Sequence, residues 1–411
     1  MKALVVLLAA VAAHEHHHAA PDKPALFQSE MAPMAGMTPR DPMYGMAMPG
    51  WSWMVMGVAR AVFNDQGGPS GDTAGESTNW NMVMAHHDLG GGRITLMMMN
   101  SLEPATIRDE GSPELFQTGE TFQGNPLVDR QHAHDFFMNL SATWRVPFSE
   151  ASGLWVQLAP VGEPALGPAA FMHRASSGEN PSAPLTHHWQ DATHITSNVV
   201  TLGGGAGAVA IEASAFHGAE PDEDRWGLEG GALDSYSGRV TLRLSGPWSA
   251  QVSCGRLDDP EALEPGDLTR TTASVHYGAR GGGPLAASLI WGRNHEDHGD
   301  SDGFLLEGAY AITAADQVFT RAEYVEKSLV LLATKELPAE GAPDESAAVR
   351  ALTVGYLRSF PPWRALETGI GGDLTVYGYP DALEPVYGET PVSGHVFVRL
   401  RWGAGSPHAH H

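Results

Sequence analysis

Apolar and polar residues alternate with a period of two along much of the chain after residue 50. In the stretch GHVFVRLRW, residues 394–402, the even-numbered positions after the glycine are apolar, whereas the opposite face of an extended strand carries Arg399 and Arg401. Two arginines on one face need water or partner charges, while a uniformly apolar face suits lipid. This pattern predicts transmembrane strands around a wet lumen.

The same alternation recurs in other segments, such as SGRVTLRLS and WSAQVSCG. We expect Leu242, Trp248 and Val398 to face lipid, because each lies on the apolar face of its strand. In FFMNLSATWR the pattern places Met138 on the outward face together with Trp144. The charged residues that fall on inward faces, and that we predict to line the lumen, are Arg239, Arg243, Arg321, Glu323, Glu367, Asp373, Arg399 and Arg401.

Connections between the predicted strands alternate between short turns and long loops. Short turns such as SGPW and TAAD are separated by long acidic loops, including one that begins at Asn64 and another that begins at His217. This arrangement is typical of bacterial outer-membrane barrels, whose long loops lie outside the cell. We therefore predict an all-β fold, a transmembrane antiparallel β-barrel of about sixteen strands over residues 51–402, with both of its ends in the periplasm. The aromatic residues expected in the interfacial girdles are Trp51, Trp80, Trp144, Trp248, Trp291, Tyr310, Tyr324 and Trp402.

The beginning of the chain predicts export to a bacterial outer membrane. Residues 1–13, MKALVVLLAAVAA, have the charge, apolar run and small residues of a signal peptide. Residues 14–50 follow as a predicted disordered segment on the periplasmic side, rich in His and Met, and residues 403–411 form a His-rich tail. The chain would then have a disordered segment, one barrel and a short tail.

Composition narrows the possible partners. The 411 residues carry a formal net charge of -24, which argues against nucleic acid as a partner and favours cations. A single cysteine excludes an intrachain disulfide. We find no nucleophile elbow, phosphate loop or dinucleotide fingerprint, so we expect no organic cofactor. Lipid and metal ions are the expected partners, and the oligomeric state is left open.

Two groups of potential metal ligands lie before the barrel. If the leader is cleaved after Ala13, the new amino terminus and the first imidazoles could hold Cu(II), while thioethers prefer Cu(I). Alternatively, the first group is a polar tail that binds metal adventitiously, and the second is an apolar linker. The candidate ligands are His14, His16, His17 and His18 in the first group and Met31, Met34, Met37, Met43, Met46 and Met48 in the second.

A third group lies in two predicted loops at the same end of the barrel. Its members are His132, His134 and Asp135 in one loop and His187, His188, Asp191 and His194 in the other, with His173 nearby. Imidazoles and carboxylates together could bind a divalent metal and activate water for hydrolysis. The alternative is a hydrogen-bonded network that holds an inward-folded loop in place.

Three segments carry resemblances to known groups of proteins. PLVDRQHAHDFF, residues 126–137, and the stretch from GEPALGP to DATHIT, residues 162–196, resemble a group of bacterial outer-membrane proteins of unassigned function. The methionine run resembles the leaders of copper-resistance outer-membrane proteins of the B type, which implies copper binding or efflux and a periplasmic metal-transfer partner. Two functions therefore stay open, a channel or metal-handling barrel and an outer-membrane metal-dependent hydrolase.

Overall fold

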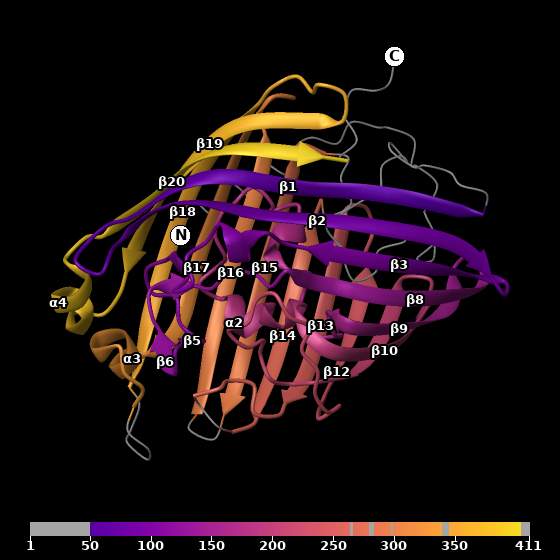
Figure 1. Ribbon diagram of the computed structural model, residues 1–411, viewed down its shortest axis with the longest axis horizontal. Helices are drawn as coiled ribbons and strands as arrows, with labels where there is room; N and C mark the ends of the chain where they lie inside the picture. The colour runs from indigo at the N-terminus through magenta and orange to yellow at the C-terminus, as the bar shows by residue number, and fades with distance from the viewer. Residues whose placement is uncertain (1–49, 264–265, 279–282, 297–298, 339–344, 404–411) are drawn as a thin grey trace.

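The structure, a computed structural model, describes residues 50–263, 266–278, 283–296, 299–338 and 345–403. Sixteen antiparallel strands close into one barrel, as predicted (Figure 1). In order around the barrel they are β1 (Trp51–Gln66), β2 (Thr73–Leu89), β3 (Gly92–Asn100), β8 (Phe137–Ser149), β9 (Ser152–Gly162), β10 (Thr196–Ala206), β11 (Val209–Phe216), β12 (Ser235–Arg243), β13 (Trp248–Leu257), β14 (Leu268–Tyr277), β15 (Leu285–Glu296), β16 (Gly299–Ala311), β17 (Asp316–Ser328), β18 (Ser346–Ser359), β19 (Leu366–Gly378) and β20 (Val392–Trp402).

The barrel closes where the first strand meets the last. β1 pairs with β20 in an antiparallel register from Gly57 opposite Trp402 to Gln66 opposite Ser393. Every backbone polar group along this seam can therefore pair with the neighbouring strand, as a hydrocarbon environment requires. Among the described residues, none of the helices has the length and apolar character needed to cross a membrane.

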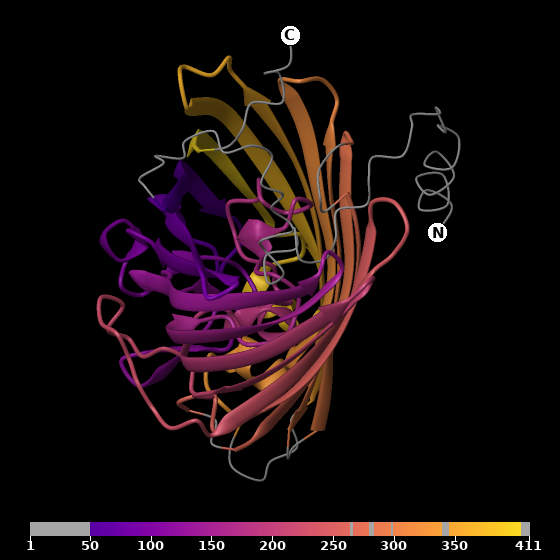
Figure 2. The same cartoon turned by 90° about the vertical axis from the view of Figure 1, so that its right-hand side faces the viewer.

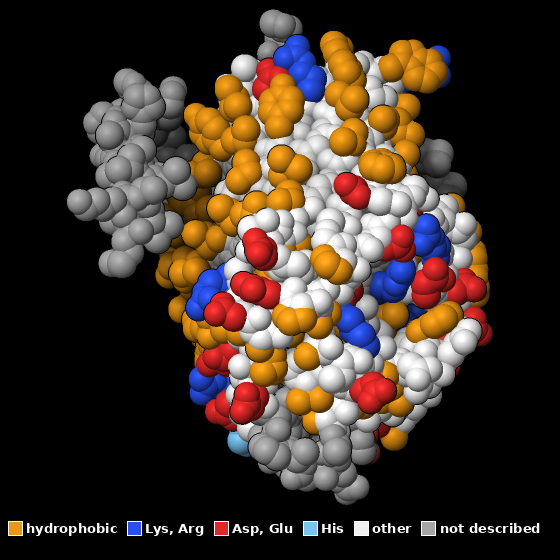
Figure 3. Space-filling view, turned by 90° about the vertical axis from the view of Figure 1, so that its left-hand side faces the viewer, with side chains coloured by type: hydrophobic (Ala, Val, Ile, Leu, Met, Phe, Trp, Pro, Cys, Tyr) orange, Lys and Arg blue, Asp and Glu red, His pale blue; other side chains and the backbone are white. Residues whose placement is uncertain are grey.

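The outer surface of the barrel is apolar over a broad area. Leu242, Trp248 and Val398 are 38%, 40% and 49% exposed, on the outer face of their strands. Figure 3 shows hydrophobic side chains gathered over the upper part of one face, while acidic and basic side chains are more frequent below. An apolar belt around a closed barrel is the surface that lipid requires, so the chain is an outer-membrane β-barrel.

The connections differ at the two ends of the barrel. Residues 90–91, 150–151 and 207–208 form tight turns at the end where β1 begins and β20 ends. At the other end lie the connections 101–136, 163–195 and 217–234. The predicted loop at Asn64 is shorter than expected, because β1 continues to Gln66 and β2 begins at Thr73.

Short elements occur within the longer connections. Residues 101–136 contain η1 (Glu103–Ala105), β4 (Ser112–Pro113), β5 (Glu120–Phe122), β6 (Asn125–Leu127) and β7 (Arg130–Gln131), and residues 163–195 contain η2 (Phe171–His173), α2 (His187–Gln190) and η3 (Ala192–His194). Farther along the chain are α3 (Leu329–Thr334), η4 (Asp381–Leu383) and α4 (Glu384–Tyr387).

Two side chains that the sequence places on the outer surface lie inside the barrel. Met138 is buried inside the barrel rather than facing lipid, because the register shifts on both sides of β8, next to Asn100 and between Leu140 and Ala142. A bulge of this kind adds one residue to the strand and reverses the alternation beyond it. Trp80 is also buried inside, with its ring against that of His173, and so lies outside the predicted girdle.

Candidate functional site in the barrel lumen

Two long connections, residues 101–136 and 163–195, fold into the barrel, and we call them the lumen loops (Figure 2). Most residues of the second loop are buried, including polar ones. Glycines in the wall make room for it. A Cβ atom at Gly292 on β15 would lie 1.9 Å from the carbonyl oxygen of Trp189 in α2, so only glycine fits there. The wall is thus shaped to receive the loop.

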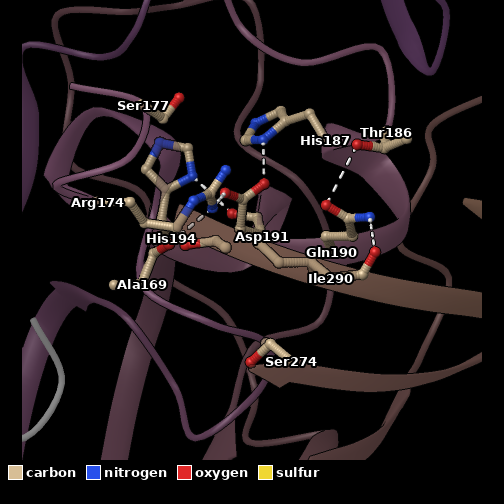
Figure 4. Close-up of polar contacts among 12 residues, drawn as sticks. Ala169, Arg174, Ser177, Thr186, His187, Gln190, Asp191, His194, Ser274 and Ile290 are labelled. Carbon is tan, nitrogen blue, oxygen red and sulfur yellow. Dashed lines mark hydrogen bonds and ion pairs between the residues drawn. The ribbon is translucent and has the colours of Figure 1, made fainter. Parts of the chain in front are cut away.

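Buried ion pairs attach the second lumen loop to β16. Arg174 donates from Nε to Glu307 Oε1 at 2.7 Å, and its Nη1 forms an ion pair with Asp191. Nδ1 of His187 lies 2.7 Å from the other oxygen of Asp191 (Figure 4). Buried charges need such compensation, because an isolated one would be strongly destabilising.

A second attachment joins the same loop to β20. Arg399 donates to Glu179 Oε1 at 2.7 Å, and Arg401 pairs with the same oxygen. Burial alone would raise the pKa of Glu179, but Arg401, Arg399 and Arg60 outweigh it and lower this pKa to about 2. The carboxylate is therefore charged at neutral pH and joins the loop to β20, while Arg60 on the neighbouring strand β1 donates to the carbonyl oxygen of Gly178 in the same loop.

The structure places the predicted lumen residues on the inner side of their strands. Arg239, Arg321, Glu323, Asp373 and Arg399 are buried, while Arg243, Glu367 and Arg401 are partly buried. Ion pairs join Arg239 to Glu212 and Glu163, Arg321 to Glu323, His395 to Asp373, and Arg399 to Glu367. Charges that the sequence predicts in a wet lumen are thus partnered by one another and by the lumen loops.

A cluster of imidazoles and carboxylates lies where the lumen loops approach the long-loop end. Glu120 Oε1 is 2.5 Å from Nε2 of His132 and 3.3 Å from Nε2 of His188. On its other side, His188 Nδ1 is 3.4 Å from Oε1 of Glu220. Burial would lower the pKa of His188, but Glu220 and Glu120 raise it to about 10. We call Glu120, His132, His188 and Glu220 the mouth cluster.

The remaining predicted histidines continue inward from the mouth cluster. The ring of His188 is 5.5 Å from that of His187, His187 is 5.2 Å from His194, and His194 is 5.4 Å from His134. Burial lowers the pKa values of His187 and His194, whereas Glu103 raises that of His134 despite burial. The sequence-predicted group is therefore a row of rings rather than one compact site.

Asp135 and Asp191 do not lie open toward this row of rings. Asp135 forms an ion pair with Arg225 at 3.2 Å, and Asp191 is held by Arg174 and His187. Both carboxylates are therefore engaged in binding protein cations. This arrangement fits the alternative of a network that holds an inward-folded loop in place.

Sequence reasoning missed a methionine cluster on the inner wall. Its members are Met54 and Met56 on β1, Met82 and Met84 on β2, Met97 and Met99 on β3, Met138 on β8, and Met172 on the second lumen loop. The available signal was the Met-x-Met spacing in three consecutive strands, since residues two apart share a face.

A cavity of about 60 Å³ lies between this methionine cluster and the row of histidines. Met84, Met97, Met99 and Met138 line it together with His173 and His194. Nδ1 of His173 and Nε2 of His194 are buried and make no hydrogen bond. Burial lowers the pKa of His173 to about 3, so both imidazoles are neutral at pH 7 and offer lone pairs.

No family model matches the sequence, and neither does any curated protein. Solved structures do match the fold. The chain is similar to an anion-selective porin from Comamonas acidovorans (14% identity, TM-score 0.53) over 86% of this chain and 100% of that one. It is also similar to OmpF of Salmonella typhi in a complex with daunomycin (7% identity, TM-score 0.52), over 87% and 100%, and to OmpT of Vibrio cholerae (8% identity, TM-score 0.50), over 87% and 100%.

The fold is that of a porin. These identities are low, and the likeness concerns the strand framework of the porin-like barrel. The candidate ligands of the first two groups, His14 to His18 and Met31 to Met48, lie outside the described residues. Within the described part, two groups in the porin-like barrel combine residue types that can act as metal ligands, the methionine cluster and the mouth cluster.

Proposed function

We propose that this porin-like barrel is a metal-handling protein that binds a soft cation in its lumen, with Cu(I) as the natural ion. One observation carries the proposal. The described chain contains nine methionines, and eight of them belong to the methionine cluster; the ninth, Met98, is exposed on the outer face of β3.

The chemistry of this cluster suits a monovalent soft ion. Thioether sulfur is a soft ligand that selects Cu(I), and imidazole nitrogen also binds copper. The cavity brings both kinds together, because His173 and His194 present unpaired nitrogens beside Met84, Met97 and Met99. A lumen that required only apolar packing would be filled as well by leucine, whose rotamers are better defined.

The position of the cluster also connects it with the segment before the barrel. Met54 and Met56 lie near the start of β1, at the short-turn end, and the predicted methionine run ends at Met48. We propose that this run receives or delivers the ion on the periplasmic side, where a metal-transfer partner would act. The acidic charge of the chain raises the local cation concentration without selecting among cations.

The test uses the full refolded chain with ¹³C-labelled methionine methyl groups, titrated with Ag(I) as a stable analogue of Cu(I). We expect the methyl resonances of Met84, Met97 and Met99 to shift, and the double variant Met97→Leu, Met99→Leu to lose the shift at Met84. Leucine replaces methionine with nearly conserved volume, so the fold is retained.

Met98→Leu is the matched control, because Met98 lies on the same strand with its side chain on the opposite face. This variant should bind Ag(I) in the lumen as the parent does. If the lumen resonances stay in place during the titration while other methionine signals move, the cluster is an apolar packing surface and the proposal fails.

A further inference from the structure

The mouth cluster is separate from the methionine cluster and differs from it in chemistry. Its four ligand-type residues come from three connections: Glu120 and His132 from the first lumen loop, His188 from the second, and Glu220 from residues 217–234. Candidate ligand atoms of Glu120, His188 and Glu220 all lie within 4.8 Å of one another. Ligands about 2 Å from a tetrahedral ion lie roughly 3.3 Å apart, so small side-chain movements would complete the geometry.

His188 supplies the observation that points to a ligand. Its side chain is only 3% exposed, and neither ring nitrogen makes a hydrogen bond, although each faces a carboxylate oxygen at 3.3 or 3.4 Å. Buried polar atoms are nearly always satisfied in folded proteins. A cation that binds at one of these nitrogens would replace the proton there, and it would supply the charge and the contacts that the two carboxylates need.

His132 faces the same carboxylate, and the backbone holds its ring in place. Its Nδ1 lies 2.6 Å from the carbonyl oxygen of Ala133, which can only accept, so Nδ1 carries the hydrogen. Nε2 is then the atom that faces Glu120. A backbone carbonyl that accepts from one nitrogen of a histidine ring and orients the other nitrogen is a common arrangement behind metal-binding imidazoles.

An acidic cavity gives cations access to the cluster. A cavity of about 470 Å³ is lined by Glu120 and Glu220 and also by Asp222, Glu223, Asp259 and Glu261. Carboxylates gathered around a recess raise the local concentration of cations. They confer no selectivity, which must come from the imidazoles of the mouth cluster.

We propose that Glu120, His132, His188 and Glu220 bind a borderline divalent cation of the Zn²⁺ type at the long-loop end of the barrel. Two imidazoles with two carboxylates suit Zn²⁺ or Cu²⁺ better than Mg²⁺ or Ca²⁺, which prefer oxygen ligands alone. This site does not depend on the proposed soft-ion function, because no thioether takes part.

The experiment measures Zn²⁺ binding to the full refolded chain together with hydrogen exchange. The histidine-rich ends of the chain carry further imidazoles, which suit Zn²⁺ as well, so the comparison is between parent and variants. Glu220→Gln should lower the stoichiometry by one equivalent. In the parent, Zn²⁺ should slow exchange in the segments around residues 120, 188 and 220, and in the variant it should not.

His188→Gln is the second variant, because glutamine can still hydrogen-bond to both carboxylates but is a poor ligand for zinc. It should fold and lose the same equivalent. His217→Ala is the matched control, since His217 pairs with Asp234 on the same connection as Glu220. That variant should retain the full stoichiometry.

Two outcomes would overturn the proposal. One is an unchanged stoichiometry in both Glu220→Gln and His188→Gln, and the other is hydrogen exchange in the three segments that does not respond to Zn²⁺. Either result would make His188 a cation that only clamps two loops together. Failure of the soft-ion function would show instead in the Ag(I) titration, which Glu220→Gln leaves unchanged.

Discussion

The inner wall of the barrel has two regions that hold the same loop by different means. On β2, β3 and β8, thioethers pack against the second lumen loop, which presents the neutral imidazoles of His173 and His194 to them. On β16 and β20, Glu307 and Arg399 bind that loop through Arg174 and Glu179. Ion pairs fix position through directed contacts, whereas methionine packing tolerates rearrangement. The charged wall therefore anchors the loop, whereas the methionine wall is the region that we propose to bind an ion.

The largest expected effect comes from removing an anchor. Arg174→Met keeps most of the side-chain volume but leaves Asp191 and Glu307 buried without their cation. Breaking a buried pair in this way costs about 3–5 kcal/mol. We expect the loop to leave the lumen, so that single-channel conductance in a planar bilayer rises and the free energy of unfolding falls. Arg293→Ala, at a partly exposed pair with Asp302, should change neither the conductance nor the free energy of unfolding appreciably.

The pH dependence of the second anchor should be almost as large. The pKa of Glu179 is about 2 in the folded chain, against an ordinary value of 4.5. Because the folded value is depressed, its stabilisation is fully present above pH 4.5 and is lost as the pH falls toward 2, with an upper magnitude of about 3 kcal/mol.

Denaturation of the parent and of Glu179→Gln, followed across this pH range, isolates the contribution of that carboxylate from those of other acids. The parent should be more stable at pH 7, and the difference should shrink to near zero at pH 2. A difference that is independent of pH would show that Glu179 does not anchor the loop through its charge.

A smaller effect tests how closely the wall fits the loop. Gly292→Ala introduces a methyl group against the backbone of Trp189, and overpacking of this kind costs about 1–3 kcal/mol. Gly308→Ala on the neighbouring strand is the control, because the nearest atom to its added Cβ lies 3.5 Å away. Equal melting temperatures for the two variants would show that the loop yields readily at α2.

The charged wall was largely predictable from the sequence, whereas the mouth cluster was predicted only in part, because His132 and His188 were candidate ligands but Glu120 and Glu220 were not. The inward orientation of Arg399 and Arg401 could be predicted, because apolar and polar residues alternate without interruption along their strand. Met138 was assigned to the wrong face, since no local signal marks the bulge beside it. The mouth cluster brings Glu120 close to Glu220, one hundred residues away in the sequence. Contacts between loops so distant from each other produce no periodic pattern from which they could be predicted.

The smallest expected change is also the one that separates packing from function. Without metal, the double variant Met97→Leu, Met99→Leu should differ from the parent in free energy of unfolding by less than about 1.5 kcal/mol, because the replacement nearly conserves volume. With Ag(I) at a hundredfold excess over its dissociation constant, the parent should gain about 2.7 kcal/mol from binding. The Met98→Leu control should show the same gain, and the double variant should lose it. If the double variant keeps the gain, the methionine wall is another packing surface like the rest of the interior, and the contrast between the two walls concerns stability alone.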